Sequence, residues 1–374
     1  MREAVKEIKA VSRRDRALAG EGAVLFLQRV SAAIEHVDSS SGAMGTAVTR
    51  AIEELVPIIA GAPIEPRLRD AWLERLWVAH ENDQIPYIES LGDHWGELCG
   101  SEGVASAWAD RLVDVTRMAL SPDPSLHGFF HGTSACLSAL YTAERYEEIV
   151  EIVAHDTIWP YKEWAVKALV AMGRRSEALR YAESCRSPWA SDAAIDAICE
   201  EILLCSGLIE EAYRRYGLRV RSGGTYLAAF RALTRKYPDK GPRQLLADLV
   251  ETTPGSEAKW FAAAKEAGLY EEALALAGSG PCDPRTLTRA CRNFAAKEPA
   301  FALEAGLLAL GWLATGYGYE VSGADALAAY SAVKEAAVNC GRSVEAAERM
   351  TEIVRMEGPG GLVGSAISRL LGVA

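Results

Sequence analysis

Apolar and polar positions in residues 164–184 repeat with the period of two short amphipathic helices joined at Gly173. The apolar positions of the first helix share one face: Trp164, Ala165, Ala168, Leu169 and Met172. Gly173 stands where a helix ends in a left-handed residue, a conformation that glycine adopts at low cost. Ala178 is small enough to let the second helix approach the first closely. The segment therefore predicts an αα-hairpin.

The same pattern recurs along the chain, with a small or apolar residue five positions after each turn. The pairs are Gly173 with Ala178, Gly207 with Ala212, Gly268 with Ala273, Gly341 with Ala346 and, more loosely, Glu144 with Ile149. Proline-marked turns at 236–239 and 297–300 fill the two long gaps, so turns are expected near positions 144, 173, 207, 239, 268, 297 and 341. Paired helices with a period of roughly 30–35 residues are typical of a helical solenoid.

Three turn sequences are close to one another: MGRRSEAL at 172–179, SGLIEEAY at 206–213 and AGLYEEAL at 267–274. With these turns the chain resembles tetratricopeptide-like repeat proteins, and it is similar to uncharacterised bacterial helical-repeat proteins. It departs from the tetratricopeptide pattern because the Trp-x-x-Leu-Gly-x-x-Tyr opening is missing and the repeat length varies. The resemblance implies an all-α solenoid of tandem antiparallel hairpins, and it transfers no functional residue.

Prolines divide the chain most clearly at Ser121–Pro124, since a helix cannot continue through Pro122 and Pro124. We expect an N-terminal helical region at 1–120, with a helix break near Gly20–Gly22, and a hairpin series at 125–374. A last amphipathic stripe follows the glycine-rich residues 358–361. It predicts a helix that closes the solenoid, with a partner-docking tail as the alternative.

Composition narrows the function classes. The chain is 49% hydrophobic and 24% charged, which excludes general disorder. Its eight cysteines form no Cys-x-x-Cys pair, so we expect free buried thiols, a reducing cytoplasmic location, and neither a metal nor a cofactor. The N-terminus lacks the apolar core of a signal peptide, and the longest uncharged run, 305–319, is too short to span a bilayer. We therefore expect no membrane association.

A locally basic stretch, residues 214–243, contrasts with the net charge of −11 for the whole chain. It contains one acidic residue, Asp239, and these basic ones: Arg214, Arg215, Arg219, Arg221, Arg231, Arg235, Lys236, Lys240 and Arg243. Such a strip can accept an acidic peptide, a phosphate or a nucleic-acid backbone. Alternatively, Glu200, Glu201, Glu210 and Glu211 neutralise it as an ordinary solvated face.

Aromatic residues gather at 159–164, where Trp159, Tyr161 and Trp164 either line a peptide groove or anchor the packing of a hairpin. The histidines of 127–132 are spaced as a metal pair on a helix would be, but Gly128 and Gly132 disfavour a helix there. No phosphate-binding loop, nucleophile elbow or His-Glu-x-x-His motif is present, so no catalytic residue is predicted.

These observations favour a non-enzymatic protein-interaction scaffold that holds a protein partner or acidic peptide in a solenoid groove. The predicted contacts are Arg215, Arg219, Arg221 and Arg235, with Trp159, Tyr161 and Trp164 as the aromatic set. One alternative is a nucleic-acid-binding helical-repeat protein that uses the basic stretch, which the net charge disfavours. Another is an enzyme whose site is assembled from distant residues such as His127, His131 and His155.

Overall fold

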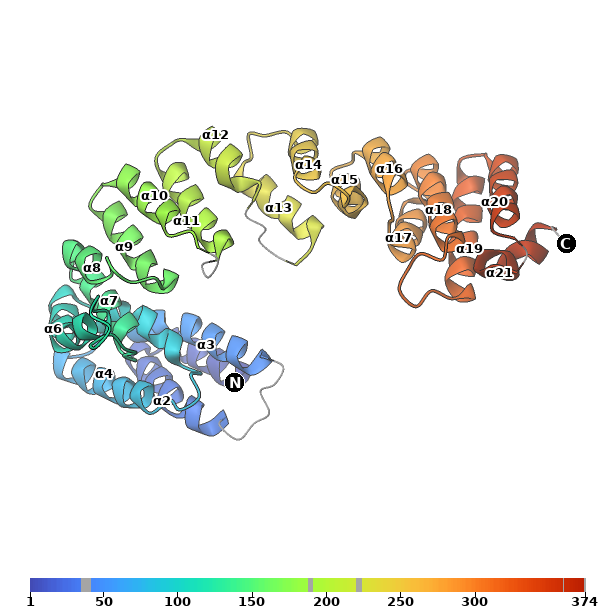
Figure 1. The fold of residues 1–374 in the computed structure, drawn as a ribbon. Helices are drawn as coiled ribbons and strands as arrows, with labels where there is room; N and C mark the ends of the chain where they lie inside the picture. The colour runs from blue at the N-terminus through green and yellow to red at the C-terminus, as the bar shows by residue number, and fades with distance from the viewer. Residues whose placement is uncertain (35–41, 188–190, 220–223, 359, 373–374) are drawn as a thin grey trace. The chain divides into compact units, whose positions relative to one another are not determined.

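The computed structural model describes residues 1–34, 42–187, 191–219, 224–358 and 360–372, and it is all-α over these ranges (Figure 1). Helices α1 to α21 follow one another with no strand in the described parts of the chain. Two compact units are formed, Met1–Ile209 and Glu210–Ala374. Each is described on its own below.

The first unit begins with long helices and continues with shorter ones. Its elements are α1 (Arg2–Ser12), α2 (Arg16–Ile34), α3 (Ala43–Ala60), α4 (Pro66–Glu81), the 3₁₀ turn η1 (Glu89–His94), α5 (Trp95–Cys99), α6 (Glu102–Ala119), α7 (Thr133–Thr142), α8 (Tyr146–Ile152), α9 (Trp159–Ala171), α10 (Arg175–Ser184) and α11 (Asp192–Cys205). Alternate helices pack on each other, α1 on α3, α3 on α5, α5 on α7 and α7 on α9. Helices α1, α5, α7 and α9 each also pack against the helix that follows them, whereas α4 packs on α2.

The second unit repeats this arrangement. Helix α12 (Ile209–Ala212) crosses the division between the units and leads into a π-helical turn, η2 (Tyr213–Gly217). The remaining elements are α13 (Tyr226–Lys236), α14 (Pro242–Glu251), η3 (Glu257–Trp260), α15 (Phe261–Glu266), α16 (Tyr270–Ser279), α17 (Pro284–Phe294), α18 (Pro299–Ala314), α19 (Gly323–Asn339), α20 (Ser343–Glu357) and α21 (Leu362–Leu371). Again α17 packs on α19, α16 on α18 and α18 on α20, and the last helix, α21, packs on α18, α19 and α20.

The hairpin turns expected from the sequence are confirmed. Every predicted turn position falls between two consecutive helices. The residues at the turns Glu144, Gly173, Gly207, Gly268 and Gly341 have φ between 56° and 77°. The residue after each donates its amide to the carbonyl five positions back, at 2.8–3.0 Å, which is the Schellman closure of a helix end. The small or apolar residues that follow are completely or almost completely buried: Ile149, Ala178, Ala212, Ala273 and Ala346.

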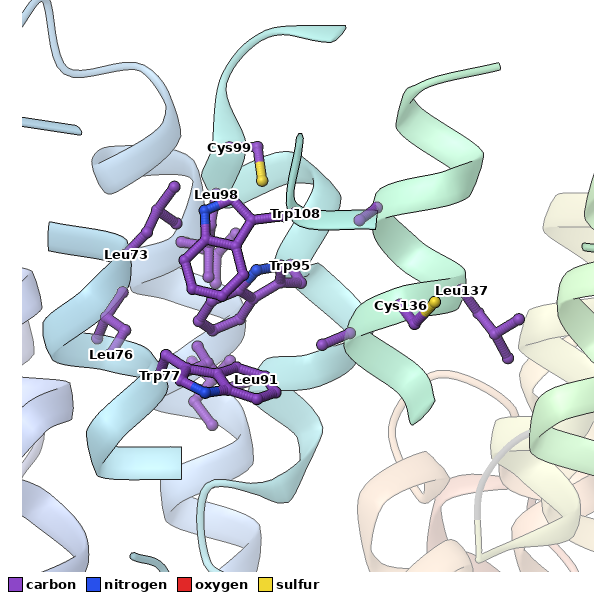
Figure 2. Close-up of a cluster of buried hydrophobic side chains, with 14 of the residues drawn as sticks. Leu73, Leu76, Trp77, Leu91, Trp95, Leu98, Cys99, Trp108, Cys136 and Leu137 are labelled. Carbon is purple, nitrogen blue, oxygen red and sulfur yellow. The ribbon is translucent and has the colours of Figure 1, made fainter. Parts of the chain in front are cut away.

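A tryptophan cluster forms the centre of the first unit's core (Figure 2). The rings of Trp77 on α4, Trp95 on α5 and Trp108 on α6 lie 5.0–5.6 Å apart, mostly edge to face. This core runs without interruption from Val5 to Ala168. Consequently the proline-rich segment at 121–124, predicted to separate two domains, joins α6 to α7 inside one unit, where those two helices pack together.

Two details of the N-terminal helices differ from expectation. The break between α1 and α2 lies at Arg13–Asp15, and Gly20 and Gly22 lie inside α2. A Cβ atom on Gly20 would come within 2.6 Å of the Trp72 ring, so this glycine permits close packing between α2 and α4. Helix α2 is also long and apolar enough, by length and composition, to cross a membrane. Core helices of soluble proteins and signal sequences meet the same criterion, and 39% of the most apolar part of α2 is buried inside the protein.

Candidate functional site

The first unit carries a groove of about 790 Å³ between α1 and α3. Its lining residues recur every three or four positions on each helix, so one face of each helix contributes. The apolar part of its lining, called the floor below, consists of small side chains, of which Val5 and Ala51 are buried: Val5, Ala10, Ala43, Ala47 and Ala51. Because these side chains are short, a partner backbone or helix can approach the two helices closely.

Cations dominate the rim of this groove. Arg2, Lys6, Lys9, Arg13 and Arg50 line it, and among the described residues Glu54 is the one lining carboxylate. Glu54 is shared between Lys9, at 2.8 Å, and Arg50, at 3.4 Å, and the hydrogen bond from Lys9 lowers its pKa. Arg2, Lys6 and Arg13 are exposed and have no ion pair with any described residue. The groove is therefore positively charged in a chain whose net charge is −11.

The basic stretch at 214–243 is largely neutralised. Arg214 pairs with Glu210 and Arg215 with Glu211, each at 2.7 Å, as the solvated-face alternative anticipated. Lys240 forms a second ion pair with Glu210, at 2.9 Å. The remaining partners come from sequence-distant helices, because Arg231 pairs with Glu266 on α15 and Arg243 with Glu272 on α16.

The four arginines predicted to bind an acidic ligand do not have equal surroundings. Arg215 lies against the ring of Tyr216, with 5.1 Å between the guanidinium and the ring centre, in addition to its ion pair. Arg219 and Arg235 are exposed and form no ion pair within the described ranges. Arg235 lines a hollow of about 630 Å³ beside the Arg231–Glu266 pair. Arg221 lies outside the described residues.

The aromatic set at 159–164 serves mainly as packing. Trp159 and Trp164 are 7% and 8% exposed, and Trp164 packs against Tyr141 at 5.8 Å between ring centres. Tyr161 is half-buried, and burial followed by the nearby Asp156 carboxylate raises the pKa of its hydroxyl. A partner could reach the edge of Tyr161, whereas the two indoles face the protein interior.

The three histidines proposed for a dispersed site are not brought together. His127 is exposed in a non-helical segment, and its Nδ1 lies 3.1 Å from the carbonyl oxygen of Ser121. His155 is exposed beside a buried Asp156, whose carboxylate accepts the Ile158 amide. His131 instead lies against His80 from α4, with ring centres 4.3 Å apart and the ring planes tilted by 50°. No group of three or more metal-ligating side chains occurs among the residues that the structure describes.

The cysteines are free, and most are buried. Burial raises the pKa of the Cys99 thiol to about 12 and that of Cys136 to about 11. These thiols are therefore protonated at neutral pH and have low nucleophilic reactivity. They behave as small apolar side chains, as the composition suggested.

Sequence reasoning missed the groove between α1 and α3. Its cations are separated along the chain, with Arg2, Lys6 and Lys9 on α1, Arg13 directly after it and Arg50 on α3, and each helix also carries glutamates. A helical-wheel count would have found the signal, because positions 2, 6 and 9 of α1 share one face. That Arg50 joins the same face follows only from the packing of α1 on α3.

No protein-family model and no curated protein sequence matches the chain. A functional proposal must therefore rest on the geometry described above.

Proposed function

We propose that the chain is a non-enzymatic interaction scaffold built as a tetratricopeptide-like solenoid of helical hairpins. Two features support the architecture: the recurrent Schellman turns, and the packing of alternate helices on one another in each unit. The packing of α1 on α3 and of α3 on α5 supports a repeat series that begins near the N-terminus, ahead of the start at residue 125 that the sequence suggested.

The proposed ligand is an acidic peptide segment of a partner protein, and the groove between α1 and α3 is its site. One observation carries this proposal: a floor of alanines flanked by cations that the chain's own carboxylates leave mostly unpaired. An amphipathic helix with small or apolar residues on one face and glutamates along both edges fits such a groove.

Exposed ion pairs contribute modestly, so affinity requires both the apolar floor and the rim. Each exposed pair is worth about 0.5 kcal/mol, and three of them amount to about 1.5 kcal/mol, or roughly tenfold in affinity. Their contribution weakens with salt because the Debye length falls from about 10 Å at 0.1 M to about 3 Å at 1 M.

A nucleic-acid ligand is disfavoured by the net charge of −11, which repels a long polyanion. The two ligand classes differ in their response to salt. The association constant for a nucleic acid falls with about the first power of the salt concentration for each phosphate contacted. A peptide held partly by apolar contacts keeps more of its affinity at high salt.

The eight free cysteines support a reducing compartment, and we propose the cytoplasm. No cofactor or metal enters the proposed activity, because peptide binding uses only side chains of this chain.

The test is fluorescence anisotropy with a labelled amphipathic peptide that carries Leu and Ala on one face and Glu on its flanks. The full-length chain is compared with the triple variant Arg2→Glu, Lys6→Glu and Arg13→Glu. We expect wild type to bind and the variant to bind at least tenfold more weakly, since three attractive contacts become repulsive.

A charge-matched control reverses Arg219, Arg235 and Arg292, all exposed in the second unit. It changes the net charge by the same amount and should bind the peptide as wild type does. If the triple variant has unchanged helicity and binds the peptide as tightly as wild type, the groove is not the binding site. Loss of affinity only in the control would move the site to the basic stretch predicted from the sequence.

A further inference from the structure

The outer face of the first hairpin is largely apolar, and the described parts of the chain leave it open. Helices α1 and α2 enclose a hollow of about 490 Å³, to which Ala4, Ile8, Leu25 and Phe26 contribute. Leu18 and Leu25 are 59% and 38% exposed. This face is distinct from the basic groove, because α1 contributes positions 4, 7 and 8 here and positions 2, 6 and 9 there.

The exposed and partly exposed positions of α2 have the spacing of a helix–helix seam. Leu18, Gly22, Leu25, Arg29 and Ala32 are separated alternately by four and three residues, as in a heptad pattern. The seam is flanked by core positions such as Val24 and Leu27, which are fully buried against the rest of the unit. Helix α2 is thus apolar on two sides, and the protein's own core covers one of them.

The seam is complementary to itself in size. If two copies of α2 pair antiparallel about Leu25, Leu18 of each lies opposite Ala32 of the other, and the two copies of Leu25 meet at the centre. The small Gly22 then lies near the aliphatic stem of Arg29 from the second copy. Leucine therefore faces leucine at the centre of the seam, and large side chains oppose small ones on either side of it.

The charges on this face are also complementary to themselves. Glu7 and Arg29 both line the hollow, and neither has an ion pair with a described residue of its own chain. A Cβ atom added to Gly22 would lie 3.7 Å from Ile8, so Glu7, the residue before Ile8, is expected near the level of residues 22–23 of α2. Antiparallel pairing about Leu25 brings Arg29 of the second copy to the level of residue 21, within reach of Glu7. Two-fold symmetry produces this pair twice.

We propose that a second copy of this chain covers the α1/α2 face, forming a two-fold symmetric dimer through α2. A two-fold contact places the same patch on both partners, so it requires a face that is complementary to itself. The basic α1/α3 groove is unsuited to this role because two copies of it would repel each other. It stays free in the dimer to bind its own ligand.

The experiment is sedimentation velocity on the full-length chain over a concentration series. We expect wild type to sediment at twice the monomer mass of 40.3 kDa, and Leu25→Asp to shift to the monomer. The matched control is Leu327→Asp on α19, a leucine with 42% exposure far from this face in sequence, which should stay dimeric.

A charge exchange makes the test specific for a second copy. Glu7→Arg alone and Arg29→Glu alone each place like charges opposite one another, so each should dimerise at least tenfold more weakly than wild type. An equal mixture of the two variants restores both opposite-charge pairs and should form the heterodimer. A monomeric wild type, or single variants that the mixture does not rescue, would overturn the proposal.

A membrane surface is the competing occupant, and flotation with anionic vesicles distinguishes it. The dimer proposal predicts that wild type stays unbound. Vesicle binding that Leu25→Asp abolishes, together with a monomeric wild type in solution, would assign the face to lipid instead.

Discussion

His80 is a buried titratable side chain that no sequence pattern pointed to. It lies 1% exposed at the end of α4, stacked on Trp77, with Nε2 at 3.3 Å from the Glu89 carbonyl. Its Nδ1 is buried without a hydrogen-bond partner among the described residues, and His131 lies against its ring. Burial, reinforced by His131, lowers its pKa to about 4. Its neutral form is therefore part of the folded state.

This arrangement predicts an acid-sensitive first unit. The pKa of His80 is about 4 when folded, against about 6.5 in an unfolded chain, so the unfolded state binds more protons between these values. The stabilisation is complete above pH 6.5 and is lost as the pH falls towards 4. His80 alone should lower the free energy of unfolding by about 2 kcal/mol between pH 7 and pH 5.

The measurement is urea unfolding at both pH values, for wild type, His80→Phe and His155→Phe. The His80 variant should show a pH dependence smaller by about 2 kcal/mol. The exposed His155 provides the control and should leave the dependence unchanged. An unaltered dependence in His80→Phe would show that another group controls the acid response.

Gly20 shows how one residue misleads a sequence-based prediction. Glycine has a low helix propensity, so Gly20 and Gly22 suggested a break between two helices. The helix continues there because its core side packs directly under Trp72, where a larger side chain would collide. The missing information was the tertiary neighbour.

At the scale of the helical element, the turn is the most predictable feature of this chain. A left-handed residue after the last helical turn, then a small residue five positions later, was sufficient to locate the hairpins. The turn at Glu144 follows the same geometry without glycine, at φ 56°, and is closed by the 3.0 Å bond from the Arg145 amide to the Leu140 carbonyl.

Opposite substitutions at equivalent turns should have opposite effects. A side chain in the left-handed region costs about 1 kcal/mol relative to glycine. Glu144→Gly should therefore raise the free energy of unfolding by up to about 1 kcal/mol, and Gly173→Ala should lower it by about the same amount. No atom lies within 4 Å of the Cβ position of Gly173, so the loss there would reflect backbone strain alone.

Thermal and chemical unfolding of the two single variants measure these changes. Gly241→Ala is a suitable control, since Gly241 has φ −64° and an equally open Cβ position. A destabilised Glu144→Gly would mean that the Glu144 side chain contributes more than the strain costs.

The basic stretch shows what a sequence cannot supply at this scale. Glu210 and Glu211 were visible as nearby counter-charges, one helical turn from their arginines. Glu266 and Glu272 pair with Arg231 and Arg243 only because α15 and α16 pack beside α13 and α14. A local excess of positive charge in the sequence is therefore partly offset in space by carboxylates from other helices.

For the molecule as a whole, the all-α class and the hairpin boundaries could be predicted, because periodicity and turn residues are local properties. The α1/α3 groove could not, since it combines the face of one helix with the face of the next helix but one. The same holds for the Trp77–Trp95–Trp108 cluster, which unites three helices in one core.

The central claim is that an acidic peptide lies in the groove between α1 and α3, and site-specific photocrosslinking tests its location most directly. A photoreactive amino acid replaces Ala47 on the groove floor or, as the control, Ala267 in the hollow beside Arg235; both alanines are partly exposed. The account predicts that the labelled acidic peptide crosslinks at position 47 and not at position 267, and that excess unlabelled peptide suppresses the product. Crosslinking at 267 alone, or at neither position under conditions where the peptide binds, would contradict it.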